Sequence, residues 1–97
     1  MTNKLPFGNN MTTIAQEPIR TLAKDPAEIG KIVRQARKQA GLRQAQAAAL
    51  CGVGTRFLSD LENGKTTLHL GKVLKVLHSF GLRVIIKRKE FSDERNP

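Results

Sequence analysis

The apolar residues after Asp25 predict an amphipathic helix. One face carries apolar side chains at three- and four-residue spacing, namely Ile29, Ile32, Val33, Ala36 and Ala40. The other side carries the polar and basic residues Lys31, Arg34, Gln35 and Lys38. Asp25 suits the N-cap, Pro26 suits the first helical position, and Glu28 is placed for a capping box. Because Gly41 favours a helix stop, we expect this helix to end near Ala40.

Two further short helices are predicted between residues 42 and 63. An alanine-rich segment of about eight residues follows Leu42 and ends at Gly52. Another short helix is expected from about Thr55 to Asn63. The glycine between the two segments indicates a tight turn.

A fourth helix and a strand are predicted after Thr66. The apolar positions of the helix are Leu70, Val73, Leu74, Leu77 and Phe80, opposite Lys72, Lys75 and Ser79, and Gly81 closes it. Residues 82–89 are β-branched and partly alternating, with Leu82, Val84 and Ile86 on one side and Arg83, Ile85 and Lys87 on the other. Because one apolar strand cannot stand alone, it is predicted to pair with its copy in a homodimer.

The length of 97 residues is enough for one ordinary domain. Residues 1–24 show no sustained helical or strand period, so we expect a flexible N-terminal arm, within which Met11 offers an alternative start. Residues 25–81 form the expected helical domain, residues 82–89 the dimerisation strand and residues 90–97 a tail.

The spacing from Gln44 to Leu61 is typical of a helix-turn-helix. With Gln44 counted as the first position, the fifth must be small and is Ala48. The ninth must tolerate a left-handed turn and is Gly52. Leu58 and Leu61 supply the buried side of the second helix. Together with an amphipathic helix before and after it, this pattern is fairly specific.

The charge balance favours nucleic acid as the partner. Seventeen Lys and Arg against eight Asp and Glu leave a formal charge of +9, and the excess is largest in residues 65–97. Four Phe, with no Trp or Tyr, leave little aromatic surface for stacking single-stranded bases. Double-stranded DNA therefore fits better than single-stranded RNA.

Other function classes have little support in the sequence. Cys51 falls on the inward face of its helix and reads as a small core residue. His69 and His78 lack further ligands at metal-binding spacing, so we expect no metal and no cofactor. Catalytic motifs are also missing, so the chain is not expected to be an enzyme. Without a membrane-spanning or signal-type apolar run it is expected to be cytoplasmic.

The segment GLRQAQAAALCGVGTRFLSDLENGK resembles the core of the Xre or lambda-repressor-like helix-turn-helix family. The resemblance covers about residues 25–80. Within that family the arrangement of residues 68–74 and 81–86 is similar to HipB-type antitoxins, which add a C-terminal strand. The resemblance implies dimerisation through that strand, repression of the chain's own operon, and binding of a HipA-like Ser/Thr kinase toxin.

Three positions depart from the family pattern. Arg43 stands where the family commonly has a capping Thr, and it cannot accept a backbone hydrogen bond. Ala47 replaces a frequent Leu, which leaves a thinner core. Gly54 removes a side chain that related repressors often place near the DNA groove.

Four residues on the second short helix are predicted to face DNA bases. They are Thr55, Arg56, Ser59 and Asp60. Arg56 matches the two acceptors of guanine, although a phosphate contact or a solvated side chain is the alternative. Thr55 and Ser59 could read bases, phosphates or only water. For Asp60, an intrahelical pair with Arg56 is preferred over a contact to cytosine.

Four other residues are predicted to bind phosphates, which positions a protein without reading sequence. They are Arg43, Gln44, Asn63 and Lys65. Gln44 begins a helix, where free N–H groups and the positive dipole end favour a phosphate. Asn63-Gly64 could equally be only a turn. Lys72 and Lys75 read as solvated residues, and the role of residues 87–89 stays open between edge protection, DNA and an acidic toxin surface.

The sequence thus predicts an all-α, lambda-repressor-like bundle of four or five helices with a C-terminal strand that pairs across a dimer. The residues expected to form that contact are Leu82, Val84, Ile85 and Ile86. The expected function is an antitoxin that represses its own toxin–antitoxin operon at an inverted-repeat operator. The alternatives are a stand-alone phage-type repressor and a protein-interaction adaptor that does not bind specific DNA.

Overall fold

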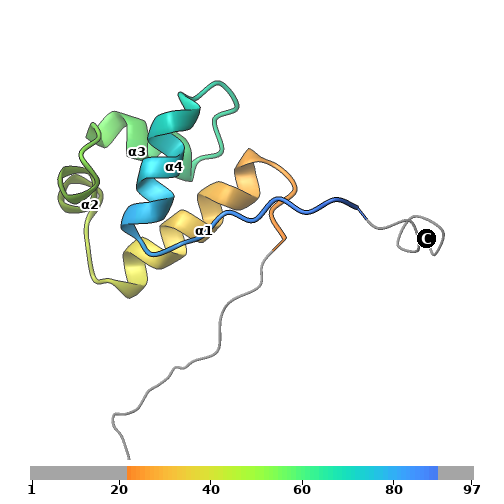
Figure 1. The fold of residues 1–97 in the computed structure, drawn as a ribbon. Helices are drawn as coiled ribbons and strands as arrows, with labels where there is room; N and C mark the ends of the chain where they lie inside the picture. Colours follow the sequence, from red (N-terminus) through yellow and green to blue (C-terminus); the bar gives the residue numbers. More distant parts are fainter. Residues whose placement is uncertain (1–21, 90–97) are drawn as a thin grey trace, which may run out of the picture.

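Four helices build the domain in the computed structural model, which describes residues 22–89 (Figure 1). They are α1 (Pro26–Gln39), α2 (Gln44–Cys51), α3 (Thr55–Glu62) and α4 (Leu70–Ser79). α3 packs against both α1 and α2, and α2 also packs against α4. The all-helical prediction is confirmed for this part of the chain. The predicted tail and all but residues 22–24 of the predicted arm lie outside it.

The first turn of α1 is capped nearly as predicted. The Asp25 carboxylate accepts a hydrogen bond from the Glu28 N–H at 2.9 Å. Glu28 reaches back, but its Oε1 accepts from the Lys24 N–H at 2.8 Å, one residue before the N-cap that a capping box would use. Both bonds satisfy backbone donors that the helix leaves free.

The turn between α2 and α3 has the predicted left-handed glycine. Gly52 has φ of +73°, and beyond it the Val53 N–H donates to the Ala48 carbonyl at 3.0 Å. At the other end of α2, Arg43 provides no side-chain cap, as expected. The Gln46 side chain compensates in part, because its Oε1 accepts from the Arg43 N–H at 2.9 Å. This second contact was not predicted from the sequence.

The core is made of small and medium aliphatic side chains from all four helices. Its buried members are Val33, Ala47, Ala48, Cys51, Leu58, Leu61, Val73, Val76 and Leu77. The predicted burial of Ala48, Cys51, Leu58 and Leu61 is therefore confirmed. Alanines at two successive positions of α2 make this core thin, as the departure at Ala47 suggested.

The buried face of α4 differs from the predicted one. Leu70 and Leu74 are 68% and 43% exposed, whereas Val76, which the prediction left out, is fully buried. The face that packs inward is Val73, Val76, Leu77 and Phe80, which also has helical spacing. Within residues 22–89, the packing of α4 is chiefly against α2, so only a narrow stripe of this helix is covered.

The predicted strand is not formed in residues 22–89, which contain no strand at all. Leu82 is half-buried against the core, and its N–H donates to the Leu77 carbonyl at 2.9 Å. From there an irregular segment leaves the bundle with Val84, Ile85 and Ile86 exposed (Figure 1). A strand requires a hydrogen-bonding neighbour, and a single copy offers this segment none. Its pairing across a dimer stays a prediction.

Gly30 allows α1 and α3 to cross with their backbones in contact. It is buried in the middle of α1. A Cβ at this position would fall on the Leu61 carbonyl oxygen and lie 2.7 Å from the Glu62 carbonyl oxygen. Since both are backbone atoms of α3, they cannot move aside without shifting that helix.

Replacing Gly30 with alanine should therefore destabilise the fold. We expect a net loss of about 2 kcal/mol, because overpacking against backbone outweighs the gain in helix propensity of about 1 kcal/mol. Urea unfolding at equilibrium measures the difference. Gly54→Ala is the matched control, since its Cβ would meet no atom within 4 Å, and it should cost less than about 1 kcal/mol. Equal losses would contradict the close crossing.

Candidate nucleic-acid interface

The solvent side of α3 carries the residues predicted to read bases. Thr55 and Arg56 are exposed in its first turn, and Ser59 and Asp60 are half-buried one turn later. Leu58, Leu61 and Glu62 occupy the opposite, buried side. The structure thus places the four predicted side chains on the side of α3 that faces away from the core, with Thr55 and Arg56 more exposed than Ser59 and Asp60.

Asp60 lies between two cations on this surface. Its Oδ2 is 3.8 Å from Arg56 Nε and 3.7 Å from Lys65 Nζ. The intrahelical pair preferred for Asp60 is therefore present, whereas the contact with Lys65 was missed. The Arg56 side chain is 91% exposed, and a pair so open to water contributes about 1 kcal/mol or less. Arg56 can leave it at little cost.

Behind α3, a buried ion pair joins that helix to α1. Arg37 Nε donates to Glu62 Oε2 at 2.6 Å, and Arg37 Nη2 donates to Glu62 Oε1 at 3.0 Å. A third donor of the same guanidinium, Nη1, binds the Leu42 carbonyl at 2.8 Å. Such a bidentate geometry fixes both direction and distance. This pair was not predicted from the sequence.

A signal for the pair was present in the helical spacing. Arg37 follows Val33 by four residues and Ile29 by eight, which places a charge in the apolar face of α1. Glu62 follows Leu58 by four residues, on the buried face of α3. Two opposite charges, each on a core-facing position, are expected to be paired because burying either alone is costly.

Gln44 joins the N-terminus of α2 to the same carboxylate. Its Nε2 donates to Glu62 Oε1 at 3.1 Å, and the side chain is half-buried. The first turn of α2 consequently has a fixed position relative to α3. Its role in phosphate binding stays a prediction, now with the geometry that holds its backbone N–H groups beside the base-facing surface.

The other predicted phosphate residues flank this surface. Arg43 is exposed before α2, and Asn63 and Lys65 are exposed after α3. Gly64 between them has φ of +80°, and the Lys65 N–H donates to the Asp60 carbonyl at 3.0 Å. Asn63-Gly64 therefore forms a turn, which was the alternative raised for this pair.

Three residues outside this surface have structural contacts. Lys72 Nζ lies 5.9 Å from the centre of the Phe57 ring, and Lys75 Nζ is 3.4 Å from the Gly52 carbonyl. His69 Nδ1 accepts from the Lys72 N–H at 3.2 Å and so caps α4.

Among residues 22–89 no His, Cys, Asp and Glu side chains gather in a group that could hold a metal ion. None of the helices described is long and apolar enough to cross a membrane.

A protein-family model described as Helix-turn-helix matches residues 33–85, which is more than half of the chain. The chain belongs to the helix-turn-helix family. The resemblance to Xre-like proteins is thereby confirmed. As a helix-turn-helix protein it is a DNA-binding transcriptional regulator, and this family is not a class of enzymes.

A similar helix-turn-helix protein is known in Sinorhizobium fredii (strain NBRC 101917 / NGR234). It is the uncharacterized HTH-type transcriptional regulator y4mF, 51% identical over 63 residues that cover 65% of this chain and 83% of y4mF.

Two solved structures share the helical arrangement. A chain in the structure of a HipA-HipB-O2-O3 complex has a TM-score of 0.65 and 21% identity, and the match covers 73% of this chain and all of that one. The restriction-modification controller protein C.AhdI from Aeromonas hydrophila has a TM-score of 0.54 and 25% identity, over 61% of this chain and 86% of C.AhdI.

The ionisation of the buried pair follows from its contacts. Burial disfavours the charged form of Glu62, but hydrogen bonds from Arg37 and Gln44 and the charges of Arg37 and Arg34 outweigh it. The pKa of Glu62 therefore lies below its ordinary value of 4.5. The hydrogen bond to Glu62 in turn raises the pKa of Arg37. Both groups are charged at neutral pH.

This helix-turn-helix domain should lose stability in acid through Glu62. Because the folded-state pKa is depressed, the stabilisation is present above 4.5 and is lost as the pH falls through the folded-state value. We expect Glu62→Gln to cost about 3 kcal/mol at pH 7, since it leaves Arg37 buried without its counter-charge. The penalty should shrink as the pH is lowered, because Glu62 in the natural chain then becomes neutral as well.

Denaturant unfolding from pH 7 to the acid range measures this difference. Glu28→Gln is the matched control, because Glu28 accepts only an exposed backbone hydrogen bond. It should cost less than about 1 kcal/mol at every pH. A Glu62→Gln penalty that does not change with pH would show that the carboxylate's charge contributes nothing.

Proposed function

We propose that this helix-turn-helix regulator binds an inverted-repeat operator as a homodimer and represses its own toxin–antitoxin operon. The observation that carries the DNA-binding part is the fixed position of α3. Its buried face is held to α1 and α2 through Glu62, while its opposite face offers Thr55 and Arg56 to solvent. A recognition helix needs both properties, since it must enter the major groove without changing its angle.

In this proposal the solvent side of α3 reads base edges. Arg56 leaves Asp60 and donates two hydrogen bonds to guanine O6 and N7, while Thr55, Ser59 and Asp60 meet neighbouring positions. The phosphates are held around it by Arg43, Gln44, Asn63 and Lys65, which set the register without reading sequence. Occupancy of the operator then blocks transcription.

The dimer is proposed from the segment after α4. In a single copy this segment exposes Val84, Ile85 and Ile86. Three adjacent apolar side chains in contact with water are unfavourable and mark an interaction site. Pairing two copies of residues 82–89 as strands would cover them and create a two-fold axis. Half-sites about 10 bp apart, or a multiple of a turn, would match that symmetry.

The antitoxin role rests on the kind of protein that this chain is similar to. HipB occurs in a solved HipA-HipB-O2-O3 complex and in a complex with an O4 20mer. By analogy, the partner proposed for this chain is a HipA-like Ser/Thr kinase toxin.

The likeness to C.AhdI, a restriction-modification controller, favours a stand-alone regulator as the second candidate. Stable co-purification with a kinase-like chain encoded beside it would support the antitoxin, and its absence would favour the second candidate.

Selection from a random double-stranded DNA pool at about 150 mM salt tests the DNA-binding function. We expect enrichment of an inverted repeat with two matching half-sites. If no sequence is enriched and binding is weak and steeply salt-dependent, the proposed sequence-specific function is wrong. The protein-interaction adaptor, the alternative drawn from the sequence, would then be the better proposal.

The selected duplex also tests the role of Arg56. Arg56→Ala should lose about 1–3 kcal/mol of discrimination at one base pair in each half-site. Lys65→Ala is the matched control, because loss of a phosphate contact weakens binding to all sequences alike. An unchanged base preference in Arg56→Ala would remove Arg56 from base reading.

Light scattering on a Val84→Lys, Ile86→Lys variant tests the dimer. Both side chains are exposed in one copy, so the helical domain should stay folded while the paired strands are driven apart by like charges. We expect monomers with weak operator binding. Arg88→Ala controls for a change in the same segment, and a double-lysine variant that remains dimeric would refute pairing through this strand.

A further inference from the structure

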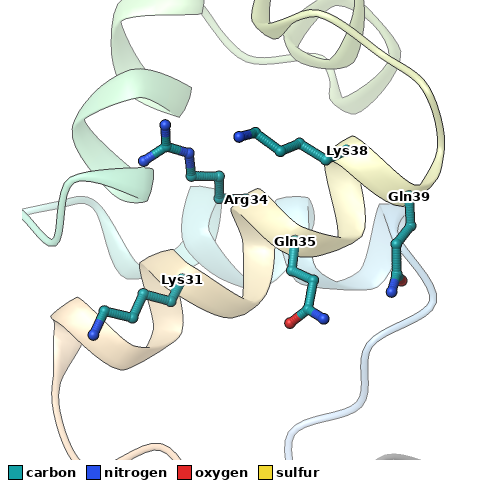
Figure 2. Close-up of a pocket in the computed structure, with 5 residues that line it drawn as sticks. All are labelled: Lys31, Arg34, Gln35, Lys38 and Gln39. Carbon is teal, nitrogen blue, oxygen red and sulfur yellow. The ribbon is translucent and has the colours of Figure 1, made fainter.

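The solvent side of α1 carries three cations that the proposed interface does not use. They are Lys31, Arg34 and Lys38, called here the α1 cation row. With Gln35 and Gln39 they line a shallow hollow on the helix surface. Figure 2 shows Arg34 and Lys38 extending from one side of α1, and Gln35 and Gln39 from the other.

The α1 cation row differs from the other basic residues of the helices. Arg37 and Arg56 have carboxylate partners, and Lys72 and Lys75 contact a ring and a carbonyl oxygen. Within residues 22–89 no ion pair involves the α1 cation row. Like charges at three- and four-residue spacing repel one another on a helix. A bound anion would remove that cost.

Arg34 connects the α1 cation row to the proposed DNA surface. Arg34 precedes Arg37 by one helical turn, and its charge acts on the Glu62 carboxylate. The same carboxylate accepts the hydrogen bond from Gln44 at the start of α2. Arg34 and the N-terminus of α2 therefore both lie near one buried carboxylate. A DNA backbone bound at the start of α2 would pass close to Arg34.

The chemistry of the hollow favours a polyanion over a protein surface. Its lining consists of Lys, Arg and Gln side chains and includes no apolar residue. Protein interfaces have apolar or aromatic residues at their centre and are poor in Lys. Neighbouring side chains of the row stand about 5–6 Å apart, which allows successive phosphates of one strand to be bound.

We propose that Arg34 and Lys38 bind DNA phosphates beside the one held at the start of α2, and so extend the footprint onto α1. Lys31 lies at the outer end of the row and adds to its field. This inference rests on the proposed DNA binding but not on the identity of the operator, because phosphate contacts are independent of sequence.

The test is the salt dependence of binding by the full chain carrying Arg34→Ala and Lys38→Ala. Two duplexes serve as probes, the selected operator and a 20-bp duplex of unrelated sequence. The slope of log K against log salt should decrease in magnitude by about 1.8 for each bound copy, because two phosphate contacts are lost. The base preference in the selection should not change.

Lys72→Ala with Lys75→Ala is the matched control, since it removes the same charge from α4. Its slope should equal that of the natural chain, and an Arg34→Lys, Lys38→Arg variant should retain the natural slope as well. Thermal unfolding of each variant confirms that the fold is kept. An unchanged slope in the alanine pair on α1, or an equal decrease in both alanine pairs, would overturn the proposal.

The two duplexes separate this inference from the proposed function. If no operator is enriched, sequence-specific repression is wrong, but the unrelated duplex still reports whether α1 contacts phosphates. If an operator is enriched and the alanine pair on α1 binds both duplexes like the natural chain, DNA binding stands and the contact by α1 is wrong.

Discussion

The buried ion pair between Arg37 and Glu62 is the constraint on which the rest of the structure depends. One guanidinium holds α3 by two hydrogen bonds and the connection between α1 and α2 by a third. Gln44 adds α2 to the same carboxylate. The free energy lost by removing two charges from water is about as large as the free energy gained from their attraction. The main effect of the pair is therefore to specify one arrangement of these helices. The surface offered to DNA is a result of that arrangement.

This directional contact compensates for a core with little bulk. Gly30 lets two backbones meet, and Ala47 and Ala48 let α2 approach α3. Small side chains permit close packing but bury little apolar area, so they contribute modestly to the free energy of folding. Hydrogen bonds to a buried charge have a preferred direction and length, so they restrict how the helices cross more than aliphatic contacts alone would.

The parts of the fold that the sequence predicted correctly depend on local rules. The cap at Asp25 and the left-handed turn at Gly52 are set by their own backbones. The pair between Arg37 and Glu62 was missed because its partners are 25 residues apart, and helical spacing shows only that each faces inward.

For α4, two overlapping stripes have helical spacing, and the neighbouring helices decide that Val76, not Leu74, is buried. For residues 82–89, alternation describes the faces of a strand but provides no partner for it. For the candidate DNA surface, the pattern correctly placed the four residues predicted to read bases on the outer side of α3 but did not show that Asp60 also lies beside Lys65.

The position of Asp60 also sets the charge that α3 presents around Arg56. Its carboxylate lies between Arg56 and Lys65 and partly offsets two positive charges on this surface. The Arg56 side chain is almost fully exposed, so its pair with Asp60 is weak and orients the guanidinium without holding it in place. Arg56 is therefore free to exchange Asp60 for another acceptor, while Lys65 stays beside the carboxylate.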